Sequence, residues 1–145
     1  NPRYEISFKL SNNLKEISYL GLGWEKYNQD SQPWTDGPNS SLILKLPNLK
    51  SGEDYFIEIE FQKKPTIKEE MIRLEISSKG LDKDYKFDFK NTSKKIILKL
   101  RDINEDNRIL ILDLKLSGMI SEFERLISPD ERLIGLKLKS LKLSQ

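Results

Sequence analysis

The stretch Leu110-Ile111-Leu112-Asp113-Leu114-Lys115-Leu116 decides the fold class, because every second residue in it is leucine. A two-residue period is that of a β-strand whose side chains point alternately to the two faces of a sheet. The leucines therefore predict one buried face. Ile111, Asp113 and Lys115 predict the opposite, solvated face.

Runs of the same kind recur along the chain, separated by turn-forming residues such as Asp36-Gly37-Pro38-Asn39 and Lys50-Ser51-Gly52-Glu53. Many short strands with regular turn signals are typical of a sandwich or barrel. We expect an all-β fold, in which two antiparallel sheets pack face to face as a jelly-roll-like β-sandwich with at most one or two short helices. The expected strands contain residues 4–10, 42–46, 55–62, 72–76, 85–90, 96–100, 110–116 and 136–143.

Two local features depart from this pattern. The last strand slips by one residue, since Leu138 is followed by Leu141, and this predicts a β-bulge at Lys139-Ser140. Ser121 and Glu124 have the spacing of a capping box, and Ser128-Pro129 would stop a helix. A short helix is therefore expected over Ser121–Ile127, with Phe123, Leu126 and Ile127 on one face.

Composition excludes several classes of function. The chain has 145 residues, with 25 Lys and Arg against 23 Asp and Glu, so a net charge of +2 does not support nucleic-acid binding driven by bulk charge. There is no His and no Cys, which excludes Ser-His-Asp and Cys-His catalysis and zinc–thiolate sites. We expect residues 1–145 to form a single β-sandwich domain taken from a longer protein, with no transmembrane segment.

Residues 19–37 are the least strand-like and contain both tryptophans, Trp24 and Trp34. The face of an indole can stack on the CH face of a pyranose, and amides and carboxylates can bind its hydroxyl groups. The alternative is that the two tryptophans fill the open end of the sandwich as core residues. The candidate carbohydrate-binding residues are Trp24, Tyr27, Asn28, Gln29, Asp30 and Trp34.

Acidic residues offer weaker candidates. Asp102, Asn104, Asp106 and Asp113 resemble the spacing of a calcium loop, but Asn107 stands where glycine is expected, and a solvated turn fits better. Carboxylates such as Asp30, Asp36 and Asp130 could form a glycosidase pair only if the fold brought two of them together. We therefore expect no catalytic residue, no metal and no cofactor.

Lysines of the last strand form a basic stripe. Lys137, Lys139 and Lys142 are expected to face away from the leucines. Such a stripe could contact a phosphate-bearing partner or an anionic membrane surface. Lysines on an exposed strand also keep it soluble and protect a sheet edge, and this simpler interpretation is the one we favour.

Two stretches together resemble a known family. The first is Tyr19-Leu20-Gly21-Leu22-Gly23-Trp24 with Trp34-Thr35-Asp36-Gly37, and the second is the run from Asp130 to Leu143, which begins Asp-Glu-Arg-Leu-Ile-Gly. They resemble the opening and closing signatures of a β-sandwich accessory domain that is often C-terminal on bacterial glycosyltransferases and cell-surface polysaccharide enzymes. A Glu commonly precedes the second Trp in that family, where this chain has Gln32-Pro33, and Ile134 replaces a Leu.

The resemblance implies a non-catalytic accessory module of a bacterial glycosyltransferase or polysaccharide-assembly protein. Such a module would contact a glycan or the catalytic domain of the same protein, in the cytoplasm, including the inner face of the cell membrane. The alternative is a protein-interaction or scaffolding sandwich without a glycan ligand. The residues that carry the structural signature are Gly21, Gly23, Asp36, Gly37, Asp130, Arg132 and Gly135.

Arg132 gives the signature a physical prediction. Its five donors need several acceptors, which another segment of the chain can supply. We expect Arg132 to be at least half buried and to hydrogen-bond the Trp34–Gly37 turn, for example at Asp36, or the chain near Tyr19–Gly23. It would then hold the closing strand beside the aromatic segment.

Overall fold

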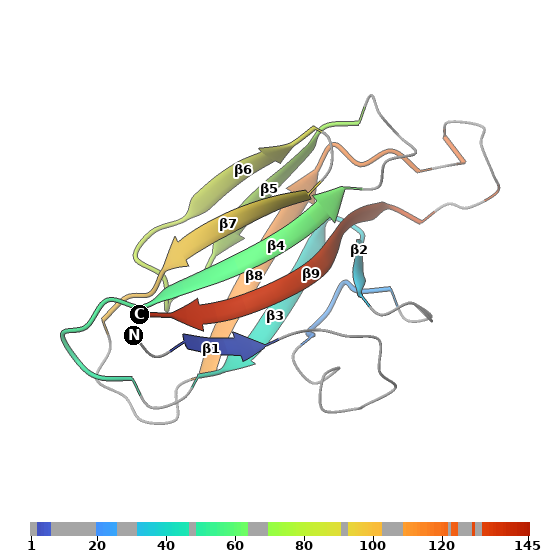
Figure 1. Ribbon diagram of the computed structural model, residues 1–145. Coiled ribbons are helices and arrows are strands. Elements are labelled where there is room, and N and C mark those ends of the chain that lie inside the picture. The colour runs from blue at the N-terminus through green and yellow to red at the C-terminus, as the bar shows by residue number, and fades with distance from the viewer. Residues whose placement is uncertain are drawn as a thin grey trace.

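The computed structural model describes residues 3–6, 20–25, 32–46, 49–63, 70–90, 93–102, 109–121, 123–124, 129 and 132–145. Within these ranges the chain forms β-strands and no helix, which confirms the all-β expectation (Figure 1). The strands are β1 (Arg3–Ile6), β2 (Trp34–Asp36), β3 (Asn39–Lys45), β4 (Phe56–Lys63), β5 (Ile72–Ser77), β6 (Tyr85–Phe89), β7 (Ser93–Lys99), β8 (Ile109–Ser117) and β9 (Ile134–Ser144).

The strands form two antiparallel sheets that pack face to face (Figure 1). The five-stranded sheet has the order β1-β9-β4-β7, with β2 also paired to β9. The four-stranded sheet has the order β3-β8-β5-β6. Because β4 pairs along one edge of β9, β1 and β2 occupy successive stretches of its other edge.

The pairing of strands is nested: the innermost pair is consecutive in sequence, and each further pair encloses the one before it. β5 pairs with β6, β4 with β7, β3 with β8 and β2 with β9. Successive pairs alternate between the two sheets, and this arrangement of eight antiparallel strands is a jelly roll. The two-sheet architecture predicted from alternation is therefore confirmed, together with its jelly-roll order.

The predicted bulge in the last strand is confirmed. Glu60 of β4 pairs with Ser140, whereas the next residue, Phe61, pairs with Leu138, so Lys139 has no residue opposite it. The extra residue keeps Leu138 and Leu141 on the same buried face although they are three positions apart.

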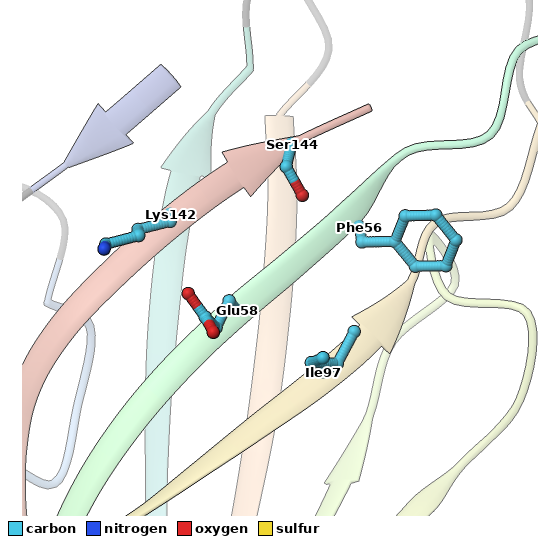
Figure 2. A pocket seen from close by; sticks show the side chains of 5 residues that line it. All are labelled: Phe56, Glu58, Ile97, Lys142 and Ser144. Carbon is cyan, nitrogen blue, oxygen red and sulfur yellow. The ribbon is translucent and has the colours of Figure 1, made fainter. Parts of the chain in front are cut away.

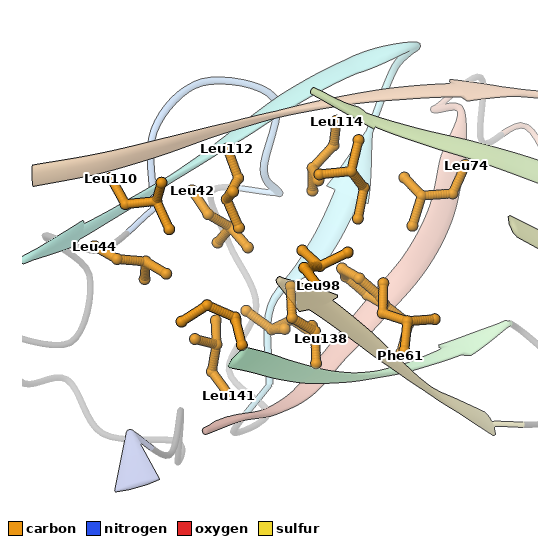
Figure 3. Packing of buried hydrophobic residues seen from close by; sticks show 14 of the residues in the cluster. Leu42, Leu44, Phe61, Leu74, Leu98, Leu110, Leu112, Leu114, Leu138 and Leu141 are labelled. Atoms are coloured by element: carbon orange, nitrogen blue, oxygen red, sulfur yellow. The ribbon is translucent and has the colours of Figure 1, made fainter. Parts of the chain in front are cut away.

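The core lies between the two sheets and consists mainly of leucine, isoleucine and phenylalanine (Figure 3). Leu42 and Leu44 of β3 and the leucines of β8 face Phe61 and Leu138 of the opposite sheet. Phe61 and Phe89 meet edge to face, with ring centroids 6.2 Å apart. The predicted core positions Leu110, Leu112, Leu114 and Leu116 are all buried.

Tyr85 joins the two sheets at the edge where β6 and β7 meet. Its hydroxyl donates a hydrogen bond to Asp82 at 2.6 Å and accepts one from the backbone N–H of Lys99 at 3.0 Å. Burial raises the pKa of this phenol, and the hydrogen bond to Asp82 raises it further. The neutral phenol is thus the form that the fold stabilises.

The expected helix over Ser121–Ile127 lies largely outside the described residues. Ser121, Phe123 and Glu124 are described, and they form a turn in which the Glu124 N–H donates to the Ser121 hydroxyl at 3.1 Å. The capping contact is thus present, and Phe123 is half exposed, while Leu126 and Ile127 lie outside the described residues. The described part of the chain contains no helix that is both long and apolar enough to cross a membrane.

Candidate functional site

Residues 20–25, which carry the first signature, join the two sheets at the edge opposite Tyr85. On one side they bind β3, since Gly21 N–H donates to the Ser41 carbonyl at 2.8 Å and Ser41 N–H donates to the Leu22 carbonyl at 3.0 Å. The Ser41 hydroxyl also accepts the Leu22 N–H at 3.0 Å. Their other side binds β2 of the five-stranded sheet.

The contact with β2 uses two further backbone hydrogen bonds. Glu25 N–H donates to the Trp34 carbonyl at 2.9 Å, and Asp36 N–H donates to the Gly23 carbonyl at 2.8 Å. Gly23 has a φ of 83°, and a Cβ there would lie 1.9 Å from the Asn39 carbonyl oxygen. Only glycine therefore fits at position 23. The Gly-Leu-Gly-Trp motif joins the two sheets at this edge of the sandwich.

Trp24 fills the end of the core. Its side chain is 8% exposed, and its indole Nε1 donates to the Ser41 carbonyl at 2.8 Å. The indole face is therefore packed against protein and unavailable to a sugar ring. This placement favours the structural interpretation of Trp24 over its role as a carbohydrate contact.

Trp34 lies on the outer surface of the five-stranded sheet. It pairs with Lys137 of β9, whose Nζ lies 5.3 Å from the centroid of the indole ring, a cation–π geometry. The side chain is partly buried. The other predicted sugar contacts, Tyr27, Asn28, Gln29 and Asp30, lie outside the described residues.

The closing signature meets the opening one, as expected, but through a different partner. Arg132 forms an ion pair with Glu25, the residue that follows Trp24. The Asp36 carboxylate accepts the N–H of Leu133, the residue before β9, at 3.2 Å. The Gly37 N–H donates to the Leu133 carbonyl at 2.9 Å. The Arg132 side chain is 47% exposed, so it is about half buried, and Asp130 lies outside the described residues.

A second bulge, in β9 opposite β2, explains why Thr35 and Gly135 are needed at their positions. Trp34 pairs with Lys137 and Asp36 with Ile134, so β9 carries one extra residue opposite Thr35. The buried Thr35 hydroxyl accepts the Leu136 N–H at 2.9 Å. A Cβ on Gly135 would lie 2.6 Å from that oxygen, so glycine is needed there. Most residues of the family-like signature thus serve the fold.

A surface depression that the sequence analysis missed lies on the outer face of the same sheet. It encloses about 350 Å³ and is formed by β4, β7 and β9. Phe56 and Ile97 give it an apolar side, and Glu58, Lys142 and Ser144 supply polar groups (Figure 2). We call these five residues the sheet-face pocket.

The register of the strands brings the pocket residues together. Phe56 pairs with Ser144, and Glu58 pairs with Lys142 on one side and Ile97 on the other. Directly paired residues in adjacent strands have Cβ atoms about 4.5–5.5 Å apart, so the five side chains form one patch. The sequence carried a signal, since Phe56 and Ile97 are apolar residues at positions that alternation assigns to the outer face.

The outer face continues from this pocket toward Trp34. Successive outward positions of β4 carry Glu60 and Gln62, and Gln62 pairs with Lys137 beside the indole. Lys139 Nζ lies 3.5 Å from Glu60 Oε1. The distance from Phe56 to Gln62 along β4 is about 20 Å at the rise of an extended strand. We call this surface, from the sheet-face pocket to Trp34, the polar face.

The β4 and β9 part of the polar face is less exposed than the outside of the other sheet. Outward side chains of β4 and of the last part of β9 are half-buried, whereas those of β8 are exposed at every outward position. Both β4 and β8 lie inside their sheets, so position at an edge does not explain the difference. The polar face offers an aromatic ring, an aliphatic surface, carboxylates, an amide, hydroxyls and ammonium groups.

Metal binding finds no support in the described part of the chain, where no group of three or more acidic side chains is placed to hold an ion. The loop with calcium-like spacing falls mainly on residues 103–108, which are not described. Of its residues, Asp102 accepts the Gly52 N–H at 3.2–3.3 Å, and Asp113 lies within β8.

Comparisons with known proteins give distant matches in structure alone. No family model matches the chain, and no curated protein matches it significantly. Two similar structures are the C-terminal CBM6 of LamC, a marine laminarinase from Zobellia galactanivorans, and the CBM36-1 domain of a multidomain xylanase from the hindgut metagenome of Trinervitermes trinervoides. Each has 10% identity and a TM-score of 0.46, covering 99% of this chain and 100% or 96% of the other, respectively.

A third similar structure is BtGH115A, a family GH115 4-O-methyl-α-glucuronidase with specificity for decorated arabinogalactans. The identity is 13% and the TM-score 0.46. The match covers 82% of this chain but 15% of the enzyme.

Proposed function

We propose that this domain is a non-catalytic carbohydrate-binding module and that it binds a glycan chain lengthwise along the polar face. The observation that carries the proposal is the sheet-face pocket, where a phenyl ring, an isoleucine and three polar side chains converge from three strands. A sugar has an apolar CH face and a rim of hydroxyl groups. The pocket is complementary to both.

Each pocket residue has a defined part in this proposal. The ring of Phe56, with Ile97 beside it, provides the surface on which the CH face of a pyranose packs. Glu58 accepts hydrogen bonds from sugar hydroxyls, the Lys142 ammonium donates them, and the Ser144 hydroxyl does either. These residues project from strands of a packed sandwich, so little backbone entropy is lost on binding.

The geometry favours binding over hydrolysis. A glycosidase needs two carboxyl groups on opposite sides of the scissile bond, about 5–10 Å apart. Glu58 and Glu60 both project from β4, and each has a lysine in register or in contact, Lys142 and Lys139 respectively. They therefore project in the same direction from one strand and do not face each other across a bound sugar.

The parent protein is a further part of the proposal. The two signatures resemble accessory domains of bacterial glycosyltransferases and polysaccharide-assembly proteins, so we place the module on such a protein, in contact with its catalytic domain. The expected location is the cytoplasm or the inner face of the cell membrane. The sequence of the full-length gene tests this: a glycosyltransferase domain in the same chain supports it, and any other enzyme domain contradicts it.

A titration with envelope-type oligosaccharides tests the carbohydrate-binding role. Native protein should bind at least one of them, with NMR shift changes concentrated on β4, β7 and β9. Phe56→Ala should weaken binding by about tenfold or more, the loss typical of a residue at the centre of an interface. Ile111→Ala, on the outside of the other sheet, is the matched control and should bind normally. Absence of binding at millimolar sugar, or shifts confined to another surface, would contradict the proposal.

The rival function is a protein-interaction or scaffolding sandwich. The burial of Trp24 favours it, because the most aromatic segment then serves the fold. The exposed side chains of Ile43, Ile109 and Ile111, which cluster on β3 and β8, also favour it. If Ile111→Ala abolished association with the parent protein's catalytic domain while no sugar bound, this rival would replace the carbohydrate-binding proposal.

A further inference from the structure

We infer that the ligand of the polar face is an acidic polysaccharide whose sugars carry carboxylate groups. This inference rests on the proposed carbohydrate-binding function and names the class of glycan. Its basis is the distribution of charge over the two outer faces of the sandwich.

The polar face has an excess of positive charge. On β4, β7 and β9 the outward positions carry five lysines against two glutamates, an excess of three, and the edge strand β2 adds one carboxylate, Asp36, which lowers the excess to two. The whole chain has a net charge of only +2. The outward charged residues of β4, β7 and β9 are Lys95, Lys99, Lys137, Lys139, Lys142, Glu58 and Glu60.

The outside of the four-stranded sheet is nearly balanced. Its outward positions carry four cationic and three anionic side chains. Several are matched in register: Arg73 binds Asp88 at 3.1 Å, and Lys86 lies 3.9 Å from Glu75. The positive excess is therefore larger on the polar face than on the outside of the four-stranded sheet, where most charges are matched by a neighbour of opposite sign.

The bulge at Lys139 creates this distribution. In a regular strand, positions 137 and 142 would point to opposite faces, because they are five residues apart. The extra residue places Lys137, Lys139 and Lys142 on the same outer face. The bulge that keeps the leucines of β9 on the buried face thus also aligns a row of lysines along its outer face.

The two glutamates leave part of this charge available to a ligand. Glu58 pairs with Lys142 in register, and Glu60 lies between Lys95 and Lys139. Lys99 is engaged by Asp54 at 3.6 Å. Lys137 is held over the Trp34 ring, and neither of its paired residues, Trp34 of β2 and Gln62 of β4, carries a carboxylate. A sugar carboxylate at Lys137 can accept hydrogen bonds from its ammonium group and from the Gln62 amide.

The partial burial of the β9 lysines strengthens such contacts. Half-buried charges are less screened by water and salt than fully exposed ones. A repeating acidic glycan laid along β9 would meet ammonium groups at successive positions, whereas a neutral glycan would leave their charges uncompensated. The face thus discriminates by charge as well as by shape.

The experiment compares polymers that differ only in charge. Polygalacturonate, alginate and hyaluronan are each titrated against their carboxyl-reduced forms. At least one acidic polymer should bind about tenfold more tightly than its reduced form and should lose affinity as NaCl rises from 0.05 to 0.5 M. Polyglutamate, which has carboxylates without sugar rings, should bind at least tenfold more weakly than that polymer.

Charge variants locate the effect. Lys137→Gln with Lys139→Gln should weaken binding of the acidic polymer by about tenfold, about threefold for each lysine. Lys45→Gln with Lys115→Gln removes the same charge from the outside of the four-stranded sheet and should change binding by less than twofold. Thermal unfolding of both variants verifies that each is folded.

The outcomes separate this inference from the proposed function. Binding of a neutral oligosaccharide on the polar face without preference for acidic polymers would overturn the inference and leave the carbohydrate-binding role standing. No binding of any sugar would overturn both. Equal binding of polyglutamate, or lysine-dependent binding to phosphatidylglycerol vesicles in place of polysaccharide, would overturn the inference in favour of general anion attraction.

Discussion

The two outer faces of this sandwich come from strands with the same alternating sequence, yet they have different properties. On β4 the outward residues Phe56, Glu58, Glu60 and Gln62 are half-buried, whereas on β8 the outward residues are all exposed. One face is partly buried along β4 and β9, polar and positively charged. The other is more exposed along its middle strand and nearly balanced in charge, and it carries three exposed isoleucines.

The difference teaches that alternation determines which side a residue faces but not how deeply it is covered. On the polar face, long side chains stand in cross-strand register, such as Glu58 beside Lys142, and each covers part of its neighbour. On β8 the residues beside Asp113 are Ser41 and Ser77, which are short and leave it exposed. Depth therefore depends on partners that are distant in sequence.

The largest expected effect tests the inner side of β8. Leu112→Ala should destabilise the protein by about 2–5 kcal/mol, because it leaves a cavity in the core. Asp113→Ala, one residue later and facing outward, should stay within about 0.5 kcal/mol. Urea denaturation of both variants measures the contrast. Similar values for the two would mean that the faces of β8 are wrongly assigned.

A smaller loss is expected at the second bulge, which holds Trp34 on the polar face. Gly135→Ala should cost about 1–3 kcal/mol, since the new methyl group would overlap the buried Thr35 hydroxyl. Adding Thr35→Ala should recover part of this loss, because it removes the overlapping oxygen. Denaturation curves of the single and double variants give the coupling, and strict additivity would argue against the bulge geometry.

The ion pair at the junction of the two signatures should have a smaller effect. Arg132→Lys should cost about 0.5–1 kcal/mol, because an ammonium cannot reproduce the planar fork against Glu25, whose side chain is only 15% exposed. Arg73→Lys is the matched control, since Arg73 and Asp88 are both about half exposed, and it should cost about 0.3 kcal/mol or less. Thermal unfolding compares the two. Equal losses would show that Glu25 contributes no more than a surface partner.

The smallest effect is expected on the exposed isoleucines of the four-stranded sheet. Ile111→Thr should change stability by less than about 0.5 kcal/mol and leave sugar binding unchanged. Binding and unfolding are measured on the same preparation. A loss of sugar affinity in this variant would contradict the assignment of the ligand to the polar face, because the ligand would then contact the four-stranded sheet.

Much of the fold could be predicted from sequence because a buried face imposes a strict period. The leucines of β8 and β9 show that period, and the three-residue step from Leu138 to Leu141 even located a bulge. The second bulge was missed, although Gly135 inside a strand pattern was a usable signal. The partner of Arg132 could not be predicted, since many carboxylates are available and only the path of residues 20–25 brings Glu25 close.

The candidate site was harder to predict. Trp24 was predicted as a sugar contact but is buried in the core, because composition alone does not distinguish a buried indole from an exposed one. The sheet-face pocket consists of residues from β4, β7 and β9, and none of its pairs is local in sequence. Only the strand register brings Phe56, Ile97 and Ser144 together, and register is a property of the assembled sheet.

The nested pairing of strands also has a consequence for how the chain folds during synthesis. β9 ends at Ser144 and lies in the middle of the five-stranded sheet, between β4 on one side and β1 and β2 on the other. While the ribosome has released only the residues before β9, the sheet has no partner for β1, β2 or one edge of β4. Pairings so distant in sequence are slow to form, on the order of milliseconds to seconds. We therefore expect the nascent chain to gain protection from proteolysis late, when β9 leaves the exit tunnel, and the polar face to be assembled in that same step.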